Sequence, residues 1–141
     1  MSKAIIRILW AEDNIGDILL IKEAFRYAGL SYQLNVVKDG AEAMDFLLRR
    51  GRFSRSHRPD LVILDLNMPK KSGREVINDI KADTSLSDIP LVVLTSSTAD
   101  RDAIDGLDPK HSLYLVKPSS FIALVNLAKQ IHNFLSSLTG L

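Results

Sequence analysis

The sequence contains no cysteine, which excludes a disulfide framework and a thiolate metal site. Its three histidines are scattered along the chain, so Zn²⁺ has no credible set of ligands. No apolar run approaches the roughly 20 residues that span a bilayer. The N-terminal stretch MSKAIIRI also lacks the long apolar core and the cleavage pattern of a signal peptide. We therefore expect a cytoplasmic protein that does not enter a membrane.

The sequence also has no large excess of positive or negative charge, since its formal net charge is only +1. That balance gives no reason to expect nucleic acid or a membrane surface as a partner. With 141 residues, 46% of them hydrophobic and 25% charged, the chain is typical of a soluble globular domain. We find no repeat or linker, and we expect a single domain over residues 1–141 without an output domain.

Short β-branched apolar runs alternate with longer amphipathic stretches along the whole chain. We expect strands at 4–10, 32–37, 60–66, 89–97 and 112–116, and helices at 14–29, 41–50, 73–83, 100–107 and 120–138. This alternation predicts parallel pairing through right-handed crossovers. The runs LVILDL and PLVVL are apolar at nearly every position, which is typical of strands covered on both faces. The predicted fold class is an α/β doubly wound, five-stranded parallel sheet.

Polar side chains stand where four of these strands end. Glu12 and Asp13 follow the first, Asp65 lies at the end of the third, Thr95 lies at the end of the fourth, and Lys117 follows the fifth. In open parallel sheets, ligands bind beyond the carboxyl ends of the strands. We therefore expect these groups to converge on one edge of the sheet.

The chemistry of this set favours a metal and a phosphoryl group. Three gathered carboxylates repel one another, and a hard divalent cation such as Mg²⁺ (or Mn²⁺) removes the conflict. A carboxylate can also attack phosphorus and form an aspartyl phosphate, and Asp65 is the candidate because it stands alone after the central strand. Lys117 would then neutralise a phosphoryl oxygen, and Thr95 would hydrogen-bond another.

The motifs ILWAEDN, LVILDLNMPKKSG, IPLVVLTSS and YLVKP, in this order and spacing, resemble the receiver domain of two-component response regulators. The resemblance covers nearly the whole chain and implies the flavodoxin-like (βα)5 fold. The phrase LDLNMPKKSGREV and the long basic insert look like the small single-domain regulators paired with phytochrome-type histidine kinases. A sensor histidine kinase is the partner that this resemblance implies.

The resemblance also assigns roles residue by residue. Asp65 is the phosphoacceptor, and Glu12, Asp13, Asp65 and the backbone carbonyl of Asn67 bind the metal. Thr95 is the switch hydroxyl, Tyr114 the switch aromatic and Lys117 the phosphate-contacting lysine. Ser97 either caps the next helix or tunes the lifetime of the phosphorylated state. The Lys117–Pro118 peptide bond is expected to be cis.

Three features depart from the common pattern or extend it. Trp10 stands where most receivers have an aliphatic residue, and the small Ala11 beside it is a candidate compensation for its bulk. Pro109 should shorten or bend the helix before the last strand. Leu127, Phe134 and Leu138 widen the apolar arc of the last helix beyond the ~100° of an ordinary surface helix. This arc indicates either a deeply packed helix or a homodimer face, and we expect a homodimer.

We interpret the chain as a phosphoacceptor signalling domain and not as an enzyme with an external substrate. One alternative is an aspartyl-phosphate phosphatase, but such enzymes need an acid two residues after the nucleophile, where this chain has Asn67. Another is an interaction module that works without phosphorylation, which the set of Asp65, Thr95 and Lys117 argues against. The basic loop 49–59 is either a solvated surface or a docking surface for a partner.

Overall fold

The computed structural model describes residues 5–139 and contains one parallel sheet. Its strands are β1 (Arg7–Ala11), β2 (Gln33–Val37), β3 (Leu61–Leu64), β4 (Leu91–Thr95) and β5 (Ser112–Val116). The order across the sheet is β2-β1-β3-β4-β5, with every neighbouring pair parallel. The order in which successive strands are added to the sheet reverses between β1 and β3, and ligands bind at this switch point in doubly wound sheets of this order. The predicted fold class is confirmed.

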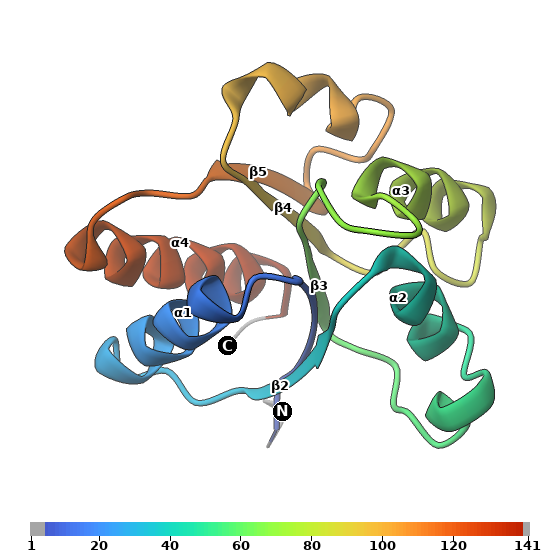
Figure 1. Cartoon of the computed structure of the whole chain (residues 1–141), viewed down its shortest axis with the longest axis horizontal. Coiled ribbons are helices and arrows are strands. Elements are labelled where there is room, and N and C mark those ends of the chain that lie inside the picture. The colour runs from blue at the N-terminus through green and yellow to red at the C-terminus, as the bar shows by residue number, and fades with distance from the viewer. Residues whose placement is uncertain (1–4, 140–141) are drawn as a thin grey trace.

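The helices are α1 (Ile15–Tyr27), α2 (Gly40–Leu47), α3 (Gly73–Ala82) and α4 (Phe121–Thr139), with 3₁₀ segments η1 (Gly51–Phe53) and η2 (Thr98–Ile104). Figure 1 shows α1 and α4 on one face of the sheet and α2 and α3 on the other. Each face has its own hydrophobic core, since alternate residues of a strand point to opposite sides. All four residues of β3 are buried, as expected for a central strand with helices on both sides.

Each of the first three helices begins directly after a turn that supplies its cap. Asn14 accepts a hydrogen bond from the backbone of Asp17, and Asp39 accepts one from Glu42. Ser72 opens α3 with a complete capping box. The helix starts are therefore fixed beside the carboxyl ends of the strands, close to where the predicted site lies.

The segment after β4 differs from the expected helix over 100–107. It is the 3₁₀ segment η2, which starts earlier, at Thr98, because the side chain of Ser97 caps the backbone of Ala99. It ends at Ile104, and the chain then turns at Gly106, which has φ = +85°. The segment thus ends before the expected residue 107, at a turn that precedes Pro109.

Trp10 and Ala11 lie on opposite faces of the sheet, so Ala11 does not offset the bulk of Trp10. Trp10 is fully buried in the core under α1 and α4, whereas Ala11 belongs to the core under α2 and α3. The alanines that share the core of Trp10 are Ala24 and Ala128, both fully buried. Both alanines lie on the helices that cover this core, one on α1 and one on α4.

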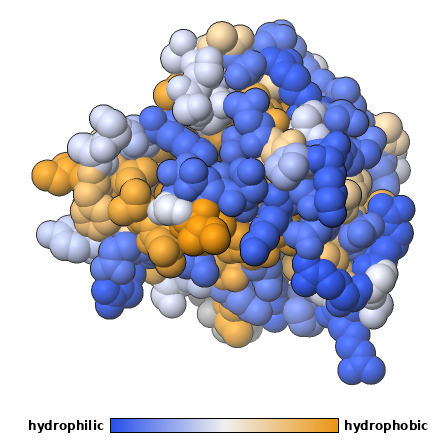
Figure 2. Space-filling model, viewed as in Figure 1, coloured by the Kyte–Doolittle hydropathy of each residue, from blue (hydrophilic) through white to orange (hydrophobic). Residues whose placement is uncertain are grey.

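The wide apolar arc of α4 is explained largely within the chain itself. Leu127 is only 4% exposed and packs in the core, so the expectation that it forms a dimer face is wrong. Phe134 is half-buried against the same core, and Leu138 is also half-buried. Exposed apolar side chains do occur nearby, at Tyr27 and Ile122, and Figure 2 shows apolar residues gathered on the side of α1 and α4.

The basic loop 49–59 is held by ion pairs with neighbouring acids. Arg52 pairs with Glu42 and stacks on the ring of Phe53, and Arg58 pairs with Asp88 at 2.6 Å.

No helix within residues 5–139 is long and apolar enough to cross a membrane.

Candidate functional site

The polar groups that follow β1, β3, β4 and β5 meet at the carboxyl edge of the sheet. One carboxylate oxygen from each of Glu12, Asp13 and Asp65 lies within 4.8 Å of the other two. Glu12 and Asp65 are buried, whereas Asp13 is exposed to solvent. Such a carboxylate cluster, open on one side, suits a hard cation that keeps part of its water shell. The residues therefore fit Mg²⁺ or Mn²⁺.

Backbone N–H groups orient two of these carboxylates. The backbone of Asn14 donates to Glu12 Oε2, and the backbone of Asn67 donates to Asp65 Oδ1, each at 3.2 Å. The side chain of Asn67 is exposed, so its assignment to the metal rests on the backbone carbonyl and stays a prediction. Each carboxylate is thus held by the turn that follows its own strand.

Lys117 places its ammonium among the acids. Its Nζ lies 2.6 Å from Glu12 and 3.6 Å from Asp65, and its side chain is only 15% exposed. Burial lowers the pKa of Lys117, but hydrogen bonds and the negative charges of its neighbours outweigh burial and hold that pKa above its ordinary value. Lys117 therefore carries a fixed positive charge next to Asp65.

The peptide bond between Lys117 and Pro118 is not cis, because residues 5–139 contain no cis bond. The expectation of a cis bond, taken from the resemblance, is therefore wrong for this structure. The trans form of an X–Pro bond is the more stable by about 0.5–1 kcal/mol. Since Lys117 Nζ reaches Glu12 from a trans backbone, the contact does not need the less favourable isomer.

Glu12 is the most perturbed acid of the site. Burial, and to a smaller extent the charge of Asp65, raise its pKa to about 7 against the opposing effects of Lys117 and the backbone of Asn14. Near neutral pH this carboxyl is therefore divided between its charged and neutral forms. A cation bound at the cluster would favour the charged form.

Thr95 closes β4 beside the acids, and its hydroxyl is fully buried. Within the described part of the chain its Oγ1 has no hydrogen-bond partner. A buried hydroxyl without a partner is costly, by about 1–3 kcal/mol. The group is therefore available to donate to an oxygen that arrives from outside the chain.

Tyr114 lies in the neighbouring strand β5, opposite Val93, and its ring is buried. Its OH donates to the carbonyl of Ser97, and the guanidinium of Arg101 lies 5.2 Å from its ring centroid. Arg74 of α3 pairs with Asp100 and Asp102 at 3.1 and 3.0 Å. These contacts tie η2 both to β5 and to α3. Ser97 has the predicted capping role, while its effect on lifetime stays a prediction.

Close backbone packing fixes the loop that carries Asp65. A Cβ added to Gly73 would lie 2.4 Å from the carbonyl oxygen of Asp65, so only glycine fits there. Gly73 also donates its N–H to Leu66 at 3.0 Å. A Cβ on Gly40 would lie 2.1 Å from the carbonyl oxygen of Lys71, which clamps the other end of the loop.

Asp17 is a residue of this site that the sequence analysis did not single out. Its Oδ2 accepts a hydrogen bond from Lys117 Nζ at 2.9 Å. The signal that could have found it is its distance from Asp13, because a residue four positions on, in the first turn of α1, stays beside the same strand end.

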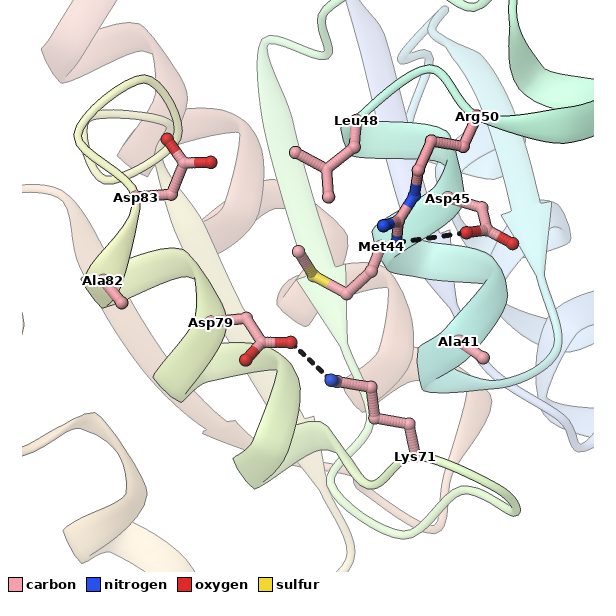
Figure 3. A pocket seen from close by; sticks show the side chains of 9 residues that line it. All are labelled: Ala41, Met44, Asp45, Leu48, Arg50, Lys71, Asp79, Ala82 and Asp83. Carbon is pink, nitrogen blue, oxygen red and sulfur yellow. Dashed lines mark ion pairs between the residues drawn. The ribbon is translucent and has the colours of Figure 1, made fainter.

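A cavity of about 430 Å³ between α2 and α3 lies apart from these groups (Figure 3). Its lining residues include none of the site residues. Lys71 pairs with Asp79 at its α3 side and Arg50 with Asp45 at its α2 side. Each of these ion pairs stays on its own side of the cavity, and the candidate site remains the edge of the sheet.

Comparison with known proteins gives consistent matches. The sequence model of the family described as "Response regulator receiver domain" matches residues 8–129. The response regulator Rcp1 of Synechocystis sp. is 38% identical over 127 residues, which cover 90% of this chain and 86% of Rcp1.

Two solved structures are similar over most of their length. The phosphorylated cyanobacterial phytochrome response regulator RcpA superposes with a TM-score of 0.83 at 38% identity, covering 96% of both chains. The Mn²⁺-bound form of Rcp1 gives a TM-score of 0.78 at 36% identity, covering 91% of this chain and 92% of that one.

Proposed function

The chain belongs to the response regulator receiver domain family, and from this premise we propose that Asp65 is its phosphoacceptor. The observation that carries the proposal is the cluster of Glu12, Asp13 and Asp65 with the ammonium of Lys117 beside Asp65. A nucleophilic carboxylate, a metal-binding acid pair and a fixed cation are the groups that phosphoryl transfer requires.

In the proposed reaction, an oxygen of Asp65 attacks the phosphorus of a phosphohistidine on a sensor kinase. The new O–P bond forms as the P–N bond breaks, and the imidazole leaves with the electron pair and takes up a proton. A Mg²⁺ or Mn²⁺ ion held by Glu12, Asp13, Asp65 and the carbonyl of Asn67 would offset the charge of the transferred group. Lys117 neutralises a further oxygen of that group.

The signal then passes through Thr95. Its buried hydroxyl, which lacks a partner in the described chain, donates to a phosphoryl oxygen on Asp65. Because Thr95 closes β4 and η2 follows closely, this new bond changes the position of η2 and of Tyr114, whose OH bonds to Ser97. A local electrostatic event thereby alters the surface formed by β4, β5 and the segments after them.

The partner that we propose is a histidine kinase of the phytochrome type, because RcpA, which is 38% identical to this chain, is named as a phytochrome response regulator. We further propose that the chain is not a turnover enzyme, because Asn67 stands where a phosphatase would need an acid. The absence of cysteine supports a cytoplasmic location.

The phosphoacceptor is tested by incubating the protein with Mg²⁺ and acetyl phosphate and measuring the intact mass. We expect the gain of one phosphoryl group in the wild type and none in Asp65→Asn. Asp39→Asn is the matched control, because Asp39 is another buried acid just after a strand and lies outside the cluster. No gain with either acetyl phosphate or a kinase would favour an interaction module, and phosphate release in large excess over protein would favour a phosphatase.

A homodimer remains a prediction, with the correction that Leu127 takes no part. Sedimentation velocity, with and without acetyl phosphate, measures the association directly. A monomer in both conditions would contradict it.

A further inference from the structure

Among residues 5–139, Asp17 is the one acid paired with Lys117 that does not belong to the carboxylate cluster. Lys117 Nζ lies 2.6 Å from Glu12, 2.9 Å from Asp17 and 3.6 Å from Asp65. In the described part of the chain, the cluster that fits a metal comprises Glu12, Asp13 and Asp65. When a cation binds the cluster or a phosphoryl group is attached to Asp65, Glu12 and Asp65 interact with these groups as well as with Lys117. Asp17 lies outside the cluster, so its carboxylate still interacts with Lys117.

The position of Asp17 is set independently of this contact. Its backbone N–H donates to the side chain of Asn14 at 2.9 Å, which fixes it in the first turn of α1. An acid in that turn is already favourable because of the helix dipole. The dipole alone does not explain the rotamer of Asp17, however, because its Oδ2 accepts a hydrogen bond from Lys117, which lies 100 residues away in sequence.

We propose that Asp17 is a positioning residue, which holds the Lys117 ammonium at the mouth of the site so that it meets the phosphoryl group on Asp65. This inference rests on the proposed function of Asp65 as phosphoacceptor. An ammonium has three N–H donors, and the bonds to Glu12 and Asp17 use two of them. One donor is then left for the oxygen of the transferred group.

The role is electrostatic and involves no proton transfer. With acetyl phosphate as donor, the Asp65 oxygen forms a bond to phosphorus while the bond between phosphorus and the acyl oxygen breaks. Acetate leaves with the electron pair, and Lys117 stays protonated throughout. Asp17 acts only through the place and orientation of Lys117, so its effect should vanish when Lys117 is absent.

The test is a double-mutant cycle on the rate of phosphorylation by acetyl phosphate. Asp17→Asn keeps the shape of the side chain and removes its charge, and we expect the rate at saturating donor to fall about 10-fold, as is typical of lost supporting contacts. Asp17→Glu should recover most of that loss, because a carboxylate one carbon longer still reaches the lysine. In a Lys117→Met background, Asp17→Asn should have no further effect.

A second measurement does not depend on phosphorylation. In ¹H–¹⁵N spectra of lysine ammonium groups, the Lys117 signal should be visible in the wild type, since its hydrogen bonds and low exposure slow proton exchange. Its absence in Lys117→Arg assigns it. We expect Asp17→Asn to broaden the signal, whereas Glu23→Gln, which removes a charge from α1 that pairs with Arg26 instead, should leave both signal and rate unchanged.

The inference would be overturned by rates within twofold of the wild type in Asp17→Asn, or by an equal loss in the Lys117→Met background. An equal loss in Glu23→Gln would also overturn it, because it would indicate a general effect of charge. If the wild type itself accepts no phosphoryl group, the proposed function fails, and the ammonium spectra still report whether Asp17 holds Lys117.

Discussion

Lys117 Nζ lies 2.6 Å from Glu12 Oε1, so a lysine after the last strand is paired with a glutamate after the first. The glutamate is almost fully buried and the lysine largely so, with side-chain exposures of 1% and 15%. A buried pair of this kind adds little net stability but is costly to break on one side. It therefore links the stability of the fold to the charge state of the site.

The first prediction concerns stability and pH. The pKa of Glu12 is raised from 4.5 to about 7. A carboxyl group with a higher pKa in the folded state binds protons more tightly when folded, so its contribution to the free energy of unfolding falls as the pH rises from about 4.5 to about 7. Urea unfolding at several pH values should show this fall in the wild type. The fall should be smaller in Glu12→Gln, and parallel curves for the two proteins would contradict the assignment.

The second prediction concerns metal affinity. A cation must displace the proton of Glu12, so below about 7 the affinity for Mn²⁺ should decrease by up to about tenfold per pH unit. Trp10, the single tryptophan, lies two residues before Glu12, and its fluorescence offers a signal for the titration. In Glu12→Gln we expect weaker binding with a flatter pH dependence. Unchanged affinity in Asp13→Asn would argue against the cluster as the metal site.

The third prediction concerns the stability that is lost when Lys117 is removed from its ion pair with Glu12. Lys117→Met keeps most of the volume of the lysine but leaves the Glu12 carboxylate without its cation. We expect a loss of about 3 kcal/mol in the free energy of unfolding at pH 8. The loss should shrink at pH 5, where Glu12 can be neutral. Lys129→Met, on the exposed face of α4, should change stability by less than about 0.5 kcal/mol at both pH values.

The site could be predicted from the sequence because strand ends are easily recognised. Glu12, Asp65, Thr95 and Lys117 each follow or close an apolar run, and parallel pairing brings such ends to one edge. The alternation of runs likewise predicted the sheet and its covering helices. The sequence pattern does not show contacts that depend on the rotamer of a side chain. Asp17, for example, cannot be distinguished by sequence from any other acid in the first turn of a helix.

Other differences have equally local causes. The core position of Leu127 depends on how deeply α4 packs, and periodicity alone cannot distinguish a buried flank from an exposed one. Trp10 and Ala11 are neighbours in sequence, yet the pleat of the strand sends them to different cores. The expectation of a cis bond before Pro118 came from the resemblance alone, and the structure has no cis bond there.

The fourth prediction concerns the loop that carries Asp65. Gly73→Ala would place a Cβ 2.4 Å from the carbonyl oxygen of Asp65, so the loop must move. We expect a loss of about 1–3 kcal/mol in the free energy of unfolding, together with slower phosphorylation by acetyl phosphate. Gly16→Ala is the control, because its Cβ would meet only the side chain of Asn14, at 3.2 Å. Equal stability of the two variants would show that the contact with Asp65 relaxes without strain.

The fifth prediction separates the structural from the signalling role of Thr95. Thr95→Val keeps the shape of the side chain and removes a buried hydroxyl without a partner in the described chain, so the unphosphorylated protein should be as stable or more stable by about 1 kcal/mol. The phosphorylated protein, by contrast, loses a hydrogen bond to the phosphoryl group. The rise in melting temperature caused by acetyl phosphate and Mg²⁺ should therefore be smaller in Thr95→Val than in the wild type.

Thr98→Val provides the control for this experiment, since Thr98 is exposed at the start of η2. It should alter neither the basal melting temperature nor its rise. A marked loss of basal stability in Thr95→Val would mean that the hydroxyl already has a partner in the resting protein, such as a bound water. In that case it would have to give up a bond before it could bind the phosphoryl group, and the switch would be driven by the difference between two bonds instead of the gain of one.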